Sequence, residues 1–265
     1  PSDGIDGWRL DVPEEVPMSF WIEWCEHVRS INPDAYIVGE IWKAKPEWLD
    51  GRTFDAVMNY PFAEIAFAWI GDRESKIPAS EAARRFEEHR ETYPAEVTYA
   101  LQNLVDSHDT DRLVSKLHNP DRPFDSGNRE QDDSTYDGSK PPPEAYARAR
   151  LIALLQMTSP GAPMIYYGDE VGMWGSDDPN NRKPMLWKDL EPYEESGQEV
   201  MEEHLAFYRD AIALRKEHPA LRTGSISTIL TDDDQDVMAF VRENEREEVL
   251  VVINAGSEPA TITLP

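Results

Sequence analysis

The sequence contains a single cysteine, Cys25, among its 265 residues, and this excludes an internal disulfide. Because Trp21, Cys25 and Val28 share a helical spacing, we expect a buried and unreactive thiol. No apolar run reaches the roughly 20 residues of a membrane-spanning helix. Glycine-rich phosphate loops, Cys/His clusters and basic stripes are missing as well, so we expect no cofactor, no bound metal and neither nucleic acid nor membrane as a partner.

Positive charge is scarce: 26 lysines and arginines stand against 52 acidic residues, and the net charge is −26. Lysine is the rarer cation, with 8 residues against 18 arginines. Such a charge repels nucleic acid and anionic membranes. An acid excess with few lysines is typical of proteins from a salt-rich cytoplasm, where dissolved ions screen self-repulsion. We therefore expect an acidic, halophilic and cytoplasmic protein.

Strand and helix patterns alternate along most of the chain, which favours an α/β fold with parallel strands. The predicted strands cover residues 5–10, 35–40, 54–59, 99–105 and 162–167. The predicted helices cover residues 17–31, 61–70, 80–93, 144–157 and 199–217, and the polar stretch 119–143 predicts a surface loop. Beyond Pro219, strand patterns at 237–241, 248–253 and 261–264 follow one another without helices, which predicts a small antiparallel β domain.

Three of the predicted strands lead into acidic residues: Asp11, Glu40 and Asp109. A single acid at a strand end is usually a cap or a salt-bridge partner, but the C-terminal ends of parallel barrel strands meet on one rim. Three acids, accompanied by Arg9 and His108, therefore predict a site. Paired carboxylates suit the cleavage of glycosidic bonds, because one stabilises the anomeric carbon and the other protonates the departing oxygen.

Six stretches of the sequence carry a resemblance to a known family. Residues 7–11 (GWRLD), 39–42 (GEIW) and 107–112 (SHDTDR) resemble the second, third and fourth signature regions of the alpha-amylase family of glycoside hydrolases. Residues 54–62, 163–173 and 178–185 resemble its cyclomaltodextrinase, neopullulanase and maltogenic amylase branch. The resemblance implies that residues 1–218 form the C-terminal half of a catalytic (β/α)8 barrel, strands four to eight, and that residues 219–265 begin a C-terminal β domain.

The resemblance also implies residue roles. Asp11 resembles the nucleophile that forms a covalent glycosyl-enzyme, and Glu40 the general acid and then base. Asp109 resembles the third acid, which binds the ring hydroxyls beside the cleaved bond. His108 resembles the neighbouring hydroxyl-binding histidine, and Arg9 the arginine that holds the nucleophile. Independently of the family, an adjacent guanidinium lowers the pKa of Asp11, and a less polar, anion-rich setting keeps Glu40 protonated.

Three further residues are expected to bind substrate. Trp42 would supply an apolar face for a sugar ring, and the alternative is ordinary packing. Asp178 and Arg182 resemble a pair that binds the sugar on the non-reducing side of the cleaved bond. For this pair the alternative is a loop salt bridge.

The resemblance implies a retaining hydrolase for α-1,4 bonds in maltooligosaccharides, cyclodextrins or related α-glucans, with α-1,6 bonds as an additional candidate. One alternative is a glucanotransferase or glucoside isomerase that uses the same residues, and another is a non-catalytic carbohydrate-binding or transporter-associated relative. Because the chain opens at Pro1 without a methionine, we expect a piece of a longer protein, with any signal peptide outside it. Calcium bound through the preceding part and a homodimer of the full-length protein remain open.

The charge composition generates a first prediction. Between low and molar potassium chloride, we expect the melting temperature and the activity of the protein to rise, because ions screen the repulsion among its acidic residues. Thermal unfolding and initial rates across a salt series measure this. Values that stay level or fall would contradict the halophilic interpretation.

Overall fold

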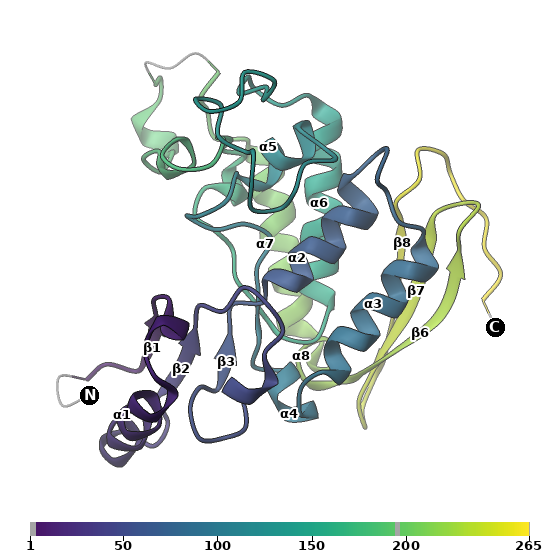
Figure 1. Cartoon of the computed structure of the whole chain (residues 1–265). Helices are drawn as coiled ribbons and strands as arrows, with labels where there is room; N and C mark the ends of the chain where they lie inside the picture. The colour runs from purple at the N-terminus through teal and green to yellow at the C-terminus, as the bar shows by residue number, and fades with distance from the viewer. Residues whose placement is uncertain (1–3, 194–196, 265) are drawn as a thin grey trace.

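The computed structural model describes residues 4–193 and 197–264 (Figure 1). Within these residues, parallel strands follow one another in chain order. One sheet contains β1 (Gly7–Leu10), β2 (Tyr36–Gly39) and β3 (Ala56–Val57), and a second contains β4 (Gln102–Asn103) and β5 (Ala162–Pro163). A parallel bridge between Met58 and Gln102 links the two sheets, so the order of the strands in space is their order in the sequence.

Helices alternate with these strands, as the sequence predicts. They are α1 (Met18–Ile31), α2 (Tyr60–Ala66), α3 (Ala79–Glu91), α4 (Ala95–Thr98), α5 (Leu113–His118), α6 (Pro143–Thr158), α7 (Glu202–Glu217) and α8 (Pro219–Thr223). A π-turn, Phe67–Gly71, extends α2, and short 3-10 turns such as Pro13–Glu15 and Asp169–Val171 lie in the loops. In the part of the chain that the structure describes, every helix is too short or too polar to cross a membrane.

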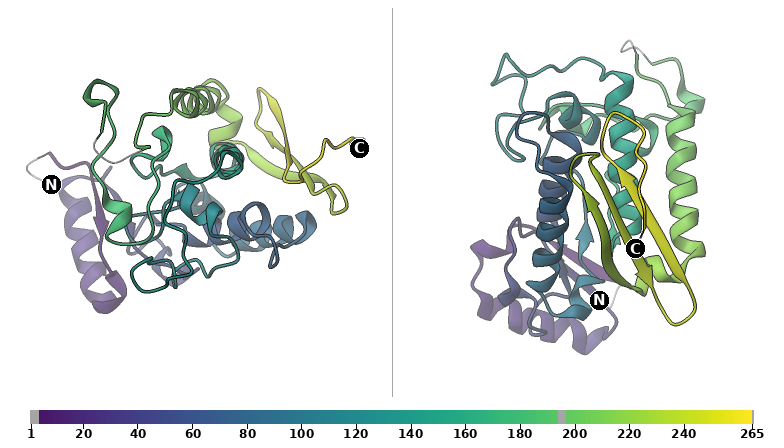
Figure 2. Two further views of the ribbon diagram at one scale, coloured as in Figure 1. Left: turned by 90° about the horizontal axis from the view of Figure 1, so that it is seen from above. Right: turned by 90° about the vertical axis from the view of Figure 1, so that its right-hand side faces the viewer.

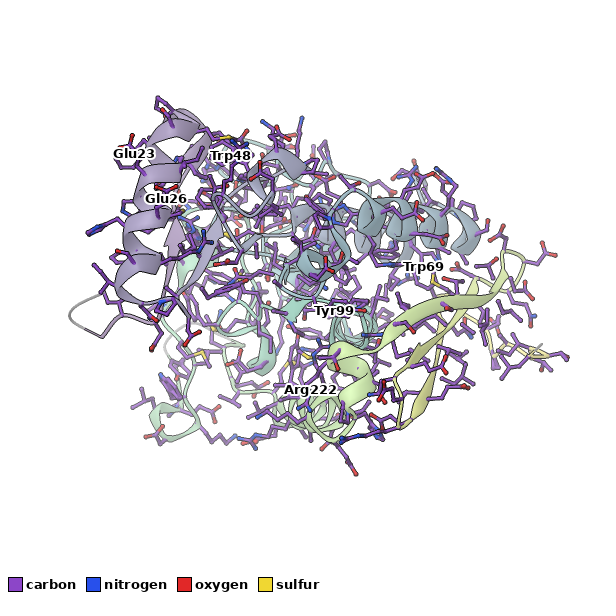
Figure 3. All side chains as sticks on the ribbon, turned by 90° about the horizontal axis from the view of Figure 1, so that it is seen from below. Glu23, Glu26, Trp48, Trp69, Tyr99 and Arg222 are labelled. Carbon is purple, nitrogen blue, oxygen red and sulfur yellow. The ribbon has the colours of Figure 1, made fainter. Side chains whose placement is uncertain are left out.

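An antiparallel sheet forms a separate layer beside the helices (Figure 2). It contains β6 (Ser225–Asp232), β7 (Val237–Glu243) and β8 (Glu248–Asn254), with β7 in the middle. Its apolar side chains Met238, Phe240 and Ile253 belong to the same buried cluster as Trp69. The Trp69 indole N–H also donates to Asp236 at 2.8 Å, and Figure 3 shows Trp69 beside this sheet. The sheet therefore shares its core with the helices.

Two buried arginines, Arg215 of α7 and Arg242 of β7, bind the end of α6. Arg215 and Arg242 have side chains that donate only to backbone carbonyls, among them those of Met157, Thr158 and Ser159 at the end of the helix. Positive groups at a helix C-terminus donate to its free carbonyls and interact favourably with the negative end of its dipole. Burial lowers the pKa of Arg242 to about 10.

A second apolar cluster lies under β1, β2 and β3. Trp21, Cys25 and Val28 of α1 pack there against Ile37 and Phe54. The thiol of Cys25 is fully buried and burial raises its pKa to about 11, which confirms the predicted unreactive cysteine.

The opposite face of α1 carries acidic side chains. Glu23 and Glu26 are both exposed there and are labelled in Figure 3. These carboxylates contribute to the charged surface on which the prediction of a halophilic protein rests.

The structure corrects several predicted elements. Residues 261–264 are not a strand, because the backbone of Thr261 bonds to the side chain of Gln235 instead of a neighbouring strand. Strand β6 was not predicted, since its serines and threonines and a register shift between Thr228 and Leu230 hide the alternation of side chains. Helix α5 was not predicted either, and the strands at 99–105 and 162–167 shrink to two residues each.

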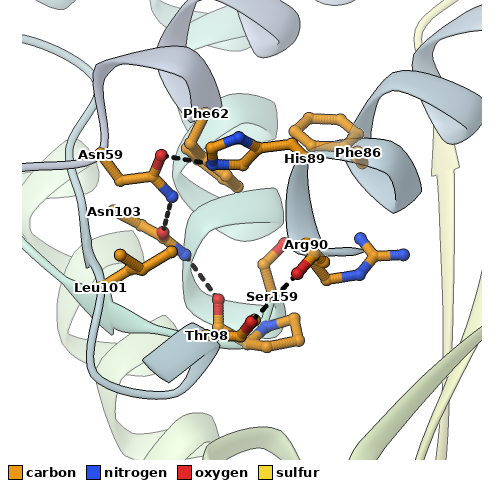
Figure 4. A pocket seen from close by; sticks show the side chains of 10 residues that line it. Asn59, Phe62, Phe86, His89, Arg90, Thr98, Leu101, Asn103 and Ser159 are labelled. Carbon is orange, nitrogen blue, oxygen red and sulfur yellow. Dashed lines mark hydrogen bonds between the residues drawn. The ribbon is translucent and has the colours of Figure 1, made fainter. Parts of the chain in front are cut away.

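A chain of buried side-chain hydrogen bonds links α3 to the strands (Figure 4). His89 Nε2 lies 2.7 Å from Asn59 Oδ1, Asn59 donates to Asn103 Oδ1 at 2.8 Å, and Asn103 donates to the Pro160 carbonyl at 2.7 Å. Because the Asn59 amide nitrogen is already a donor, its oxygen must accept from His89. His89 Nε2 therefore carries a proton. Burial, followed by the charge of Arg90, lowers the pKa of His89 to about 4, so the ring is neutral at neutral pH.

This network predicts an acid-sensitive contribution to stability. Unfolded His89 has a pKa near 6.5, so the unfolded state gains a proton first as the pH falls. The contribution of neutral His89 to the free energy of unfolding is complete above pH 6.5 and is lost as the pH falls toward 4. At pH 5 the loss is roughly 2 kcal/mol. A His89→Gln variant keeps an N–H donor but cannot titrate. Urea unfolding at pH 8 and pH 5 should show a smaller acid loss in the variant than in the wild type, and equal losses would contradict the assignment.

Candidate active site

Two of the predicted acids leave adjacent parallel strands at the same level. Leu10 of β1 pairs with Gly39 of β2, and the Glu40 N–H donates to the Leu10 carbonyl at 2.9 Å. Asp11 and Glu40 each follow the last residue of their strand, so the register brings them to one edge of the sheet. Their side chains differ in exposure: that of Asp11 is 76% exposed and that of Glu40 is 5% exposed.

Arg9 connects the two carboxyl groups. Its NH1 lies 2.5 Å from Asp11 Oδ1, and its NH2 lies 2.8 Å from Glu40 Oε1. The other oxygen of Glu40, Oε2, accepts the backbone N–H of Val12 at 3.0 Å. One guanidinium and one backbone amide therefore fix the orientation of both acids.

The backbone at Val12 is strained. Its φ of 39° and ψ of 51° lie in the left-handed region, which β-branched residues rarely occupy. Such a conformation costs on the order of 1–3 kcal/mol, and it is typical of functional sites. Here it turns the chain directly after Asp11 and points the Val12 N–H at Glu40.

Asp109 joins the same group from the loop after β4. Its side chain is within hydrogen-bonding reach of Glu40, and Glu40 is in turn within reach of Asp11. His108 Nε2 lies 3.0 Å from Asp109 Oδ2, and Arg182 NH2 lies 3.1 Å from Asp109 Oδ1. The three acids thus meet at one place, with Glu40 between the other two.

The surroundings give Asp11 and Glu40 opposite protonation tendencies. The hydrogen bond and the charge of Arg9 lower the pKa of Asp11, so this carboxyl is ionised at neutral pH. Burial raises the pKa of Glu40, and the nearby Asp109 carboxylate raises it further, against the opposing effects of Val12 N–H and Arg9. This is the direction that the sequence predicts for an ionised and a protonated partner.

Aromatic side chains form one wall of the site. Trp42 stacks on Tyr60 with ring centroids 3.7 Å apart, and the Tyr60 hydroxyl lies 3.2 Å from Ser107 Oγ. Ser107 Oγ accepts the Asp109 N–H at 3.1 Å. One face of Trp42 is therefore occupied by packing, as the alternative interpretation holds. Only its remaining surface is available to a ligand.

Arg182 and Asp178 form a salt bridge with Nε 3.1 Å from Oδ1. The same Arg182 reaches the His108 carbonyl at 2.9 Å and Asp109. The two interpretations of the pair are thus compatible, since a loop salt bridge lies directly beside the acids. A cavity of about 380 Å³ opens here, and its walls include Asp109, Asp125, Arg129, Asp177, Asp178 and Arg182.

Some residues of the site carried no signal in the sequence. Arg129 and Asp177 pair at 3.1 Å and line this cavity, although they come from separate loops. Tyr60 stacks on Trp42, and the sequence does not show this contact. In the described ranges, no group of three or more His, Cys, Asp or Glu side chains is placed to hold a metal ion.

Comparisons with known proteins identify the family of the chain. Residues 2–224 match the family described as alpha amylase, catalytic domain. The cyclomaltodextrinase of Geobacillus thermopakistaniensis is 37% identical over 261 residues, which are 98% of this chain and 38% of that protein. Neopullulanase 2 of Thermoactinomyces vulgaris is 38% identical over 261 residues, which are 98% of this chain and 39% of that protein.

A solved structure gives the same result. The debranching enzyme from Nostoc punctiforme has a TM-score of 0.80 and 34% identity, and the match covers 98% of this chain and 49% of that one. The chain therefore spans less than half the length of each of these three relatives. The matched residues include all three acids and their arginine, and the chain belongs to the alpha-amylase family.

Proposed function

We propose that the protein containing this chain is a retaining glycoside hydrolase for α-1,4 glucosidic bonds in maltooligosaccharides, cyclodextrins or related α-glucans, with α-1,6 bonds as an additional candidate. The observation that carries the proposal is the shared guanidinium of Arg9, which holds an exposed Asp11 of lowered pKa beside a buried Glu40 of raised pKa. Relatives named cyclomaltodextrinase and neopullulanase support the choice of substrate.

In the proposed mechanism, Asp11 attacks the anomeric carbon and Glu40 gives its proton to the departing oxygen. A covalent glycosyl-Asp11 results. Glu40, now ionised, takes a proton from the incoming water. The water oxygen attacks the anomeric carbon and displaces the Asp11 carboxylate, which frees the sugar and restores both acids. Asp109 and His108 bind ring hydroxyls beside the cleaved bond, and this binding favours the distorted ring of the transition state.

We also propose roles for the residues around the acids. Asp178 and Arg182 bind the sugar on the non-reducing side, in the cavity that begins at Asp109. Trp42 contributes the apolar surface that Tyr60 leaves free. Arg9 keeps Asp11 ionised and separates it from Glu40 until substrate enters.

We infer that β1 to β5 are strands four to eight of a (β/α)8 barrel, with residues 1–218 as its C-terminal half and residues 219–265 as the start of a C-terminal β domain. Five parallel strands in chain order, within the described residues, support this arrangement. The preceding strands would come from residues outside this chain. Calcium binding and dimerisation through those residues stay predictions, as does a cytoplasmic location.

Transfer to a sugar acceptor is the main alternative, because a sugar hydroxyl can replace water in the second step. Product analysis at high acceptor concentration separates the two: a hydrolase releases mainly short maltooligosaccharides, and a transferase forms new glycosidic bonds. A non-catalytic relative is disfavoured by the presence of Asp11, Glu40 and Asp109 together.

Isosteric substitutions of the two central acids test the mechanism. In the whole protein, Glu40→Gln should lower kcat on the order of 10²–10⁴-fold, because no proton reaches the leaving oxygen. Asp11→Asn should lower it at least as much, because no covalent intermediate forms. The wild-type activity should also fall at alkaline pH as Glu40 ionises, and Glu40→Gln should lose this alkaline limb.

Sugar binding supplies the control for this experiment. Maltooligosaccharide affinity, measured by calorimetry, should persist in Glu40→Gln and weaken when Arg182→Ala is added to it. Turnover at wild-type rates in both Asp11→Asn and Glu40→Gln would overturn the proposed function.

A further inference from the structure

A second group of carboxyls meets behind the proposed site. Asp106 lies three residues before Asp109, and Asp169 lies on the loop after β5. Their exposed fractions are 0% and 3%, so water does not solvate either carboxyl. The two side chains are hydrogen-bonding neighbours of one another.

A single cation, Arg112, accompanies this pair. It is fully buried, its NH1 lies 3.4 Å from Asp169 Oδ1, and the same nitrogen donates to the Tyr167 carbonyl at 2.7 Å. Of the other titratable groups that face the pair, Glu170 is an acid, burial raises the pKa of Asp111 to about 7, and burial lowers the pKa of His204 to about 4. None of them supplies a second positive charge at neutral pH. Two ionised carboxylates against one arginine would leave an uncompensated negative charge in the interior.

The hydrogen bonds of the two carboxyls indicate that one of them carries a proton. Asp106 Oδ2 accepts the Leu113 N–H at 2.8 Å. The remaining oxygens, Asp106 Oδ1 and Asp169 Oδ2, are buried and have no donor. Two ionised carboxylates cannot satisfy each other because both only accept. One proton between them would satisfy both oxygens and leave the group of Asp106, Asp169 and Arg112 neutral.

We propose that Asp106 and Asp169 share one proton in the folded protein at neutral pH, and that this acid pair positions the loop that carries Asp109. The positioning part rests on the proposed function, and the shared proton does not. Burial is the largest effect on both groups, and it raises the pKa of Asp106 and that of Asp169. The phenols of Tyr166 and Tyr208, which also face the pair, stay neutral because burial raises their pKa as well.

The pair can position Asp109 because it anchors both ends of one loop. Residues 106–112 begin at Asp106 and end at Arg112, and both contact Asp169. The Arg112 guanidinium also stacks over the rings of Tyr166 and Tyr167, 4.6 and 4.8 Å from their centroids. Asp109 lies in the middle of this loop, so breaking the anchor would loosen the contact between Asp109 and Glu40.

Proton release on unfolding tests the shared proton directly. At pH 6 both acids ionise in the unfolded chain, because an unperturbed Asp has a pKa of about 3.9. The wild type should therefore release one proton from the pair when it unfolds. In Asp106→Asn or Asp169→Asn the amide N–H replaces that proton, so each variant should release one proton fewer. Titrating groups that do not face the pair are common to the three proteins and cancel.

The double variant, Asp106→Asn with Asp169→Asn, fixes the number of protons. It should also release one proton fewer than the wild type, because a single proton is shared. Two fewer would mean that each acid is protonated independently, and no difference would mean that both are ionised. Either result overturns the proposal. So would failure of both single variants to fold, since an amide supplies the hydrogen bond that the proposal requires.

Enzyme kinetics test the positioning role separately. Asp106→Ala should lower kcat/KM about 10-fold to 100-fold, because a misplaced binding group weakens the transition state, and Asp106→Asn should restore most of it. If the Asp106→Ala variant is less stable but has an unchanged kcat/KM, the pair has only a structural role, and the proposed positioning of Asp109 is overturned. If the wild type has no glycosidase activity, the proposed function fails, while the proton count still decides the shared proton.

Discussion

The arrangement of the site depends on one guanidinium that contacts two carboxyls. Arg9 lies two residues before Asp11 on the same strand, and its two terminal nitrogens contact Asp11 and Glu40. The parallel register of β1 and β2 brings Glu40 to this position, and the strained turn at Val12 completes its hydrogen bonds. Without the arginine, two close acids would compete for protons, and neither would have a defined protonation state.

The fold supplies this constraint through short strands and extensive loops. The parallel strands contain two to four residues each, so most of the positioning depends on side-chain contacts between loops. Buried charges recur in these contacts: Arg215 and Arg242 hold the end of α6, and Arg112 lies with Asp106 and Asp169 behind the acids. Each of these arginines donates to backbone carbonyls, and such hydrogen bonds offset part of the cost of burying a charge.

The sequence was informative where a residue's position follows from the end of a strand. Asp11 and Glu40 were predicted to lie together, and the register of β1 and β2 brings them together. The opposite pKa directions of these two acids were also predicted from Arg9 and from burial, and both agree with the structure. The cause is local, because Arg9 and Asp11 are neighbours on one strand.

The sequence was less informative where contacts join distant loops. Nothing in it showed that Arg129 would pair with Asp177, or that Tyr60 would cover one face of Trp42. Strand β6 was not predicted because its polar residues and its bulge hide the two-residue period of a strand. Residues 261–264 have the pattern of a strand, but Thr261 bonds to the side chain of Gln235. Such outcomes depend on tertiary contacts, which override local preference. The roles of the site residues stay predictions from resemblance and geometry.

The most direct test of the account is to trap the covalent intermediate. A fluorinated maltosyl fluoride should form a stable glycosyl-enzyme with the whole protein, because the ring fluorine slows both steps while the good leaving group, fluoride, keeps the first step fast. Mass spectrometry of the digested protein should place the sugar on Asp11. A label on Glu40 or Asp109, or continued turnover with no label on any carboxyl, would contradict the central claim that Arg9 holds Asp11 as the nucleophile.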